Sequence, residues 1–209
     1  MCIRDSYKVD PSDGSNESYR FPFPSSHCTA IVRYGTNLYI STLGTGLINF
    51  DTATATFGDI VHVGNDLVSD ISLHGDTIYI ATDGEGLYTS TGGAPQRFDA
   101  ALRSKSVYSL LVDDAGLLWV GYYQAGVDYT PFVGDIFEKY HIPGTDHDTP
   151  MTVRSLYIDR DSKLIGTREG LYYVDEATRT TKHFRSPEIR SNIIFCITYW
   201  RGRYYIGTY

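Results

Sequence analysis

The sequence repeats itself with a period of about 40 residues, and this period constrains the fold more than any other feature. A short apolar segment occurs five times, and its central aliphatic residues are separated by 40, 40, 45 and 41 positions. These anchors are Ile40, Ile80, Val120, Ile165 and Ile206. A second aliphatic residue lies nine positions before each anchor: Ile31, Ile71, Leu111, Leu156 and Ile197. Such agreement indicates a repeat protein, in which neighbouring units cover each other's apolar faces.

The content of one copy identifies the kind of repeat. In the third copy, short β-type runs at Val107–Val112 and Leu117–Tyr122 flank a polar turn that ends in Gly116. Two further runs follow at 127–130 and 137–141. Four short strands in roughly 40 residues are typical of one blade of a β-propeller. A helical solenoid is disfavoured, because no window of about 10–12 residues shows apolar residues at helical spacing.

The composition agrees with an all-β chain. Aromatic residues make up 14% of the sequence, which contains 18 Tyr and 20 Gly. Tyr and Gly enrichment with few strong helix formers favours strands joined by tight turns. The net charge of −7 argues against nucleic-acid binding, so we expect no direct nucleic-acid contact. No apolar run approaches the roughly 18–20 residues that a membrane-spanning helix needs.

We therefore predict an all-β fold, a partial β-propeller of about four to five blades of four antiparallel strands in an incomplete ring. The predicted blades span residues 27–66, 67–106, 107–151 and 152–192, with a partial blade at 193–209 and a lead-in or partial blade at 7–26. A closed ring of six to eight blades would need ~240–320 residues, so we expect an open arc. Residues 1–6 resemble a translated sequencing adapter, and we expect them to be an artefact.

Three segments carry a family resemblance. Residues 118–127 resemble the LWIGT–x–GGL core of two-component-regulator propeller repeats. Residues 154–159 together with 164–175 look like another such repeat, and 204–209 look like the start of a further one. The departures from the repeat pattern are Ser41 and Ala81 in place of Gly, and Tyr122 in place of Thr.

These repeats are typical of the periplasmic sensor region of hybrid two-component histidine kinases in Bacteroidetes. The resemblance implies a non-catalytic, ligand-sensing propeller fragment whose ligand is an oligosaccharide derived from glycans. It also implies a periplasmic location, a homodimer in the full-length parent, and contact with the membrane only through other parts of the chain. A ligand could signal only by binding two arrangements of that dimer with different affinities.

Two other functions stay open, namely the propeller of a carbohydrate-active enzyme (a lyase or glycosidase) and a protein-interaction scaffold. An enzyme of this kind needs a carboxylate pair or an Arg/Tyr/His set around the channel, and the sequence shows no clear one. A scaffold of the tryptophan–aspartate repeat type is disfavoured, because the Trp-Asp dipeptide is absent. We interpret the His- and Asp-containing segment 141–148 as an ordinary loop, and we expect no metal and no cofactor.

Loops between second and third strands lie on one rim of a propeller, and here they differ between copies, as specificity-bearing positions would. A Tyr face suits the apolar face of a pyranose ring, while amide and guanidinium groups suit its hydroxyls. The candidate ligand-binding residues are Tyr122, Tyr123, Gln124, Arg154, Arg168 and Glu169. Arg154 precedes the innermost strand of the fourth copy and is expected to face the central channel. The competing interpretation is that both tyrosines pack between blades and that Arg168 pairs with Glu169.

Overall fold

The computed structural model describes residues 5–23, 27–98, 101–131, 137–146 and 150–209. Every regular element within these residues is a β-strand. Along the same stretches there is no helix that is both long and apolar enough to cross a membrane.

Four sheets each contain four consecutive antiparallel strands, and we number them blades 1 to 4. Blade 1 comprises β3 (His27–Tyr34), β4 (Asn37–Leu43), β5 (Gly46–Asp51) and β6 (Thr56–Val61). Blade 2 comprises β7 (Val68–His74), β8 (Thr77–Thr82), β9 (Gly86–Ser90) and β10 (Gln96–Arg97). Blade 3 comprises β11 (Val107–Val112), β12 (Leu117–Tyr122), β13 (Val127–Pro131) and β14 (Glu138–Tyr140). Blade 4 comprises β15 (Val153–Ile158), β16 (Ser162–Thr167), β17 (Leu171–Asp175) and β18 (Thr180–Phe184).

Two hairpins flank the four blades. The first pairs β1 (Asp5–Val9) with β2 (Asn16–Arg20), and the second, which we call the terminal hairpin, pairs β19 (Ile194–Trp200) with β20 (Arg203–Thr208). The adapter-like residues 1–4 lie outside the described residues, whereas the backbone of residues 5 and 6 pairs with β2.

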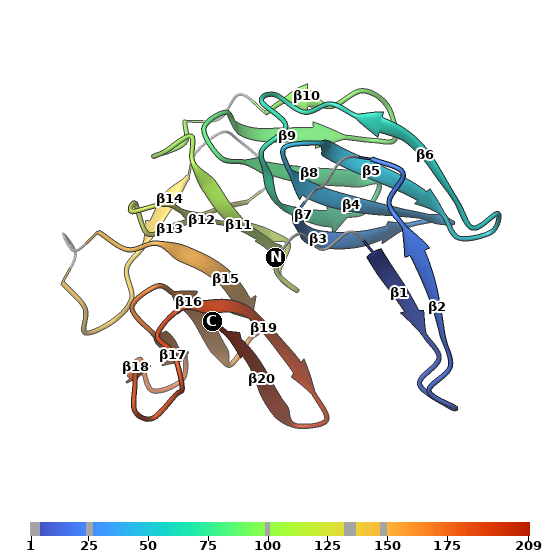
Figure 1. Ribbon diagram of the computed structural model, residues 1–209. Helices are drawn as coiled ribbons and strands as arrows, with labels where there is room; N and C mark the ends of the chain where they lie inside the picture. The colour runs from blue at the N-terminus through green and yellow to red at the C-terminus, as the bar shows by residue number, and fades with distance from the viewer. Residues whose placement is uncertain (1–4, 24–26, 99–100, 132–136, 147–149) are drawn as a thin grey trace.

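The blades and the terminal hairpin are neighbouring sectors of an open arc (Figure 1). Their innermost strands lie side by side in chain order, β3 against β7, β7 against β11, β11 against β15, and β15 against β19. Each sheet remains separate from its neighbours, as in the radial arrangement of propeller blades. This confirms the prediction of an all-β, partial β-propeller.

Successive side chains of one strand are buried against two different neighbouring blades. In β12, Leu118 and Val120 pack in a cluster with Leu87 of blade 2, whereas Trp119 packs in a cluster with Ile165 of blade 4. This alternation follows from the two-residue period of a strand. Full burial of one such aliphatic side chain contributes about 1.5–3 kcal/mol, so each blade depends on the neighbours that cover it.

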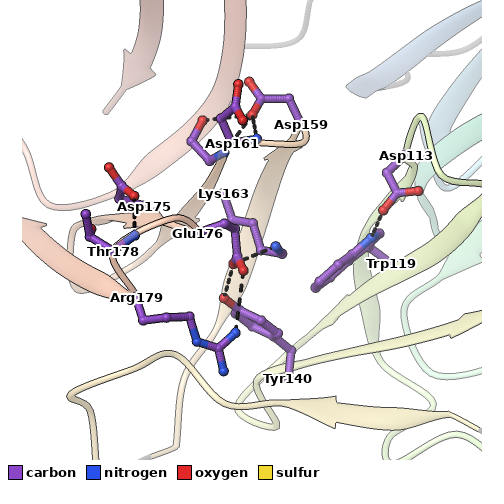
Figure 2. Close-up of polar contacts among 11 residues, drawn as sticks. Asp113, Trp119, Tyr140, Asp159, Asp161, Lys163, Asp175, Glu176, Thr178 and Arg179 are labelled. Carbon is purple, nitrogen blue, oxygen red and sulfur yellow. Dashed lines mark hydrogen bonds and ion pairs between the residues drawn. The ribbon is translucent and has the colours of Figure 1, made fainter.

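A polar cluster joins blades 3 and 4 (Figure 2). Lys163 Nζ lies 2.6 Å from Oε1 of Glu176, and this oxygen also accepts a hydrogen bond from the Tyr140 hydroxyl at 3.1 Å. Lys163 Nζ also lies 5.5 Å from the ring centroid of Trp119, whose Nε1 donates to Asp113 Oδ2 at 2.7 Å. Because Tyr140 and Trp119 belong to blade 3 and Lys163 to blade 4, these contacts fix the two blades together.

Backbone N–H groups of the turns between second and third strands bind the connection that leads into the next blade. Each N–H donates to a carbonyl of that connection: Gly44 and Gly46 to Asp66, Gly84 and Gly86 to Lys105, and Gly126 to Met151. These hydrogen bonds satisfy backbone groups of loops that leave the sheets, and they hold the loops of one rim in place.

Candidate functional site

The innermost strand of every blade, and of the terminal hairpin, contains a β-bulge at the same repeat position. Its pairing with the second strand shifts register across one residue in all five cases. The residues at the shift are Thr29, Ser69, Tyr108, Arg154 and Phe195. Bulges redirect a side chain and are common beside functional sites. The scaffold is thus constant, while the five side chains that it redirects all differ.

These five side chains line one cavity of about 740 Å³. Leu43 ends the second strand β4, and Asp83 directly follows the second strand β8. Every other lining residue comes from an innermost strand. The cavity therefore lies along the inner side of the arc, where the axis of a propeller runs. Cavities of this size are in the range that accommodates small ligands, about 300–1,000 Å³.

The side of the cavity formed by blades 1 and 2 presents small hydroxyl side chains. Thr29 Oγ1 donates to the Val68 carbonyl at 2.9 Å, and Ser69 Oγ donates to the Val107 carbonyl. Both hydroxyl protons are thereby engaged in joining one innermost strand to the next. Blade 2 also contributes the carboxylates of Asp70 and Asp83, whereas Arg154 and the aromatic side chains Tyr108 and Phe195 lie on the other side, at blades 3 and 4 and the terminal hairpin.

On that side, the Arg154 guanidinium lies between two aromatic rings. Its central carbon is 5.4 Å from the ring centroid of Tyr108 and 5.3 Å from that of Phe195. Cations are attracted to aromatic faces at such distances. The Nε atom of Arg154 is buried and has no hydrogen-bond partner. The sequence-predicted position of Arg154 in the channel therefore agrees with its place in the cavity.

Two carboxylates share the cavity with Arg154. The Tyr108 hydroxyl donates to Asp83 Oδ2 at 3.4 Å, and burial together with the Asp83 charge raises the pKa of Tyr108 above its ordinary value. Asp70 accepts backbone N–H bonds from Ile71 at 2.9 Å and from Leu110 at 2.7 Å. Burial raises the pKa of Asp70 to about 7, although these two donors act in the opposite direction.

The rim residues of blade 3 divide between core and surface. Tyr122 is fully buried in the core between blades 2 and 3, so its side chain packs between blades and does not reach a ligand, in contrast to the sequence-based expectation. Tyr123 is 36% exposed and lies against Tyr108 with ring centroids 5.4 Å apart. Gln124 has a positive φ of 54°, and its N–H donates to Thr152 Oγ1 at 3.3 Å.

The other predicted rim residues lie apart from the cavity. Arg168 and Glu169 are exposed in the turn between β16 and β17. The Arg168 N–H donates to the Thr152 carbonyl at 3.3 Å, and the Glu169 carbonyl lies 3.2 Å from Nε2 of His183. Neither residue lines the cavity that contains Arg154. In the segment 141–148, residues 147 and 148 lie outside the described residues.

Sequence reasoning missed Tyr108 and Phe195, the two rings that flank Arg154. The available signal was their position: each follows the first aliphatic residue of an innermost strand, as Arg154 does. At this position the copies differ, whereas the preceding position is Cys or an aliphatic residue in every copy. This signal alone does not predict the bulge, because a bulge is a property of the pairing between two strands.

Comparison with known protein families gives one match. A family described as "Two component regulator propeller" matches residues 101–124, which contain β11 and β12 of blade 3. This confirms the resemblance to two-component-regulator propeller repeats for that part of the chain. No curated protein matches the sequence.

Solved structures with a similar fold include the following three. The extracellular domain of BT4673, a hybrid two component system from B. thetaiotaomicron, has a TM-score of 0.65 at 17% identity, and the match covers 99% of this chain and 37% of that chain. PorZ, a bacterial surface component of the type-IX secretion system of Porphyromonas gingivalis, has a TM-score of 0.68 at 17% identity and coverages of 94% and 34%. A chain of the Mitotic Checkpoint Complex has a TM-score of 0.72 at 13% identity and coverages of 93% and 60%.

At these identities the similarity establishes the fold alone. The chain spans 37% of the length of the BT4673 domain, so it corresponds in extent to a part of that domain.

Proposed function

We propose that this chain is part of the ligand-sensing propeller of a hybrid two-component histidine kinase, and that it binds oligosaccharides derived from glycans. The observation that carries the proposal is the cavity lined by the five bulge residues. Tyr108 and Phe195 present ring faces on which a pyranose can stack, and Arg154 and Asp83 supply polar groups for its hydroxyls. No covalent chemistry is part of this role.

Two comparisons support the sensor context. The two-component-regulator match covers the strand that contains Tyr108, and the fold resembles the extracellular domain of a hybrid two component system. In the longer parent, this region would lie in the periplasm and form part of a homodimer. Ligand binding would then change the kinase only through a difference in affinity between two arrangements of the dimer.

Titration calorimetry of the chain with a panel of defined glycan oligosaccharides tests the proposal. Phe195 and Tyr199 lie on the same strand and are both 47% exposed, but only Phe195 lines the cavity. We expect at least one oligosaccharide to bind, Phe195→Ala to weaken its binding about tenfold or more, and Tyr199→Ala to leave it unchanged. Equal loss in both variants, or no binding by any member of the panel, would contradict a saccharide site in this cavity.

A further inference from the structure

We infer that the ligand of this cavity is an acidic saccharide, whose carboxylate or sulfate group binds the Arg154 guanidinium while neighbouring hydroxyls donate to Asp83. This inference rests on the proposed function, because it specifies the class of saccharide for the same cavity. It follows from which hydrogen-bonding groups of the cavity are already satisfied and which are not.

The guanidinium of Arg154 has aromatic neighbours but lacks an acceptor at Nε. Its central carbon lies 5.4 and 5.3 Å from the ring centroids of Tyr108 and Phe195, and the buried Nε has no hydrogen-bond partner. Among the described residues, none forms an ion pair with Arg154. A guanidinium directs all its N–H donors into its own plane, and buried charged donors without acceptors are costly. A carboxylate or sulfate in that plane accepts two parallel hydrogen bonds, which is the strongest pairing that Arg makes.

The two carboxylates of the cavity show why a simple inorganic anion is a poorer ligand. Both oxygens of Asp70 already accept backbone hydrogen bonds, so Asp70 has a structural role. Among the described residues, the Asp83 carboxylate accepts only a long hydrogen bond, 3.4 Å, from Tyr108. An anion without donors would meet the Asp83 charge unfavourably, because like charges at short range repel. A sugar acid supplies hydroxyl donors for Asp83 beside the anionic group for Arg154.

The aromatic rings favour a ligand with a flat apolar face, in addition to the anionic group for Arg154 and the hydroxyl donors for Asp83. Tyr108 and Phe195 lie on either side of Arg154, and Tyr123 extends the aromatic surface beside Tyr108 toward the rim. Ring faces next to a cation suit a flat apolar sugar face that carries a charged substituent at its edge. Together with Asp83 of blade 2, these groups fit a hydroxylated ring with an acidic substituent.

The test uses the full chain, at concentrations at which light scattering shows it to be dispersed, and three probes matched in size. These are trigalacturonate, its methyl ester, which removes the charge, and a sulfated galactotriose. Affinities are measured by calorimetry for the native chain and for Arg154→Met and Arg154→Lys, with Arg160→Met as the control. Arg160 is exposed in the turn at the far end of β15 and does not line the cavity. Circular dichroism establishes that each variant keeps its β-structure.

We expect at least one acidic probe to bind tenfold or more tightly than the methyl ester, and the tighter one identifies the carboxylate or the sulfate as the recognised group. Arg154→Met should abolish this preference, Arg154→Lys should restore part of it, and Arg160→Met should preserve it. Binding of the methyl ester as tightly as of the acids, or a preference that survives in Arg154→Met, would overturn the inference while leaving a saccharide sensor intact. If all three probes fail to bind but neutral oligosaccharides from the wider panel bind, the acidic-ligand inference is overturned and the saccharide sensor is kept. If no saccharide binds, both proposals are overturned.

Discussion

Gly121 occupies a position in the second strand that has no room for a side chain. A Cβ atom there would overlap the Ser109 hydroxyl on the paired strand and would lie 2.7 Å from Cγ1 of Val153 in blade 4. Ser41, a departure from the repeat pattern, is paired instead with Ala30, and its hydroxyl donates to the Ala30 carbonyl at 3.2 Å. At position 121, Gly is therefore required by the Ser109 hydroxyl and by the proximity of Val153 in the next blade.

We expect Gly121→Ala to lower the free energy of unfolding by about 2–3 kcal/mol, because the methyl group must displace both Ser109 and Val153. Ser109→Ala in the same chain should recover only part of this loss, since the contact with Val153 remains. Gly93→Ala is the control, because a Cβ at Gly93 meets no atom within 4 Å. Urea denaturation measures all three, and equal stabilities of Gly121→Ala and Gly93→Ala would contradict the steric argument.

Asp70 should make the stability of the protein depend on pH. Its folded-state pKa of about 7 lies above the ordinary value of 3.8, so the folded protein holds this proton more tightly than the unfolded chain. The resulting stabilisation is complete below about pH 4 and is lost as the pH rises toward 7. Between about pH 4 and pH 7, we expect the native chain to lose about 2 kcal/mol of unfolding free energy relative to Asp70→Asn. This value allows for the partial exposure of the Asp70 side chain. Urea denaturation at the two pH values measures it, and a difference that does not change with pH would contradict the shift.

An ion pair of blade 4 lies where this blade contacts Tyr140 and Trp119 of blade 3. Lys163 and Glu176 have side chains that are 12% and 20% exposed. Burial raises the pKa of Glu176, but Lys163, Tyr140 and Arg179 outweigh this, so the pKa lies below its ordinary value. The corresponding stabilisation is present at neutral pH and is lost as the pH falls through the lowered pKa.

We expect Lys163→Met to cost about 2 kcal/mol at pH 7, because it leaves the Glu176 carboxylate without its closest cation. The cost should shrink at pH 4, where the carboxyl takes up a proton in the variant. Glu176→Gln in the Lys163→Met background should recover most of the loss, since it removes the unpaired charge. A cost that is the same at both pH values would show that Lys163 stabilises the interface by packing rather than by charge.

The strands and the position of Arg154 could be predicted from the sequence, whereas the two aromatic rings beside Arg154 could not. Aliphatic spacing and polar turns mark β11 and β12 of blade 3 because the two-residue period and turn chemistry act locally. The bulge at Tyr108 is a property of the register between two strands, and it is visible only when both are paired. Tyr122, a candidate rim residue from its sequence position, ends the regular strand β12 and is fully buried between blades 2 and 3.

At the scale of the whole molecule, the terminal hairpin leaves one face of the arc uncovered. Ile197 and Ile206 pack in the cluster shared with blade 4. On the opposite face, Trp200 is 55% exposed and Tyr205 is 46% exposed, with ring centroids 6.2 Å apart. In the interior of the arc, the equivalent face of each sheet is covered by the next blade, so exposed aromatic rings and an unpaired strand edge favour association with other chains.

We therefore expect the isolated 209-residue chain to associate or aggregate in a concentration-dependent way, as size-exclusion chromatography with light scattering would measure. The double variant Trp200→Lys/Tyr205→Lys should shift the distribution toward monomer, because it charges the uncovered face while leaving the contacts with blade 4 in place. Val9→Lys removes an equally exposed apolar side chain from the β1–β2 hairpin and should leave association unchanged if the terminal hairpin is responsible. A sharp, reversible melting transition of a monomeric native chain would contradict this expectation, since it would show that an arc of blades can stabilise its last apolar face without a further blade.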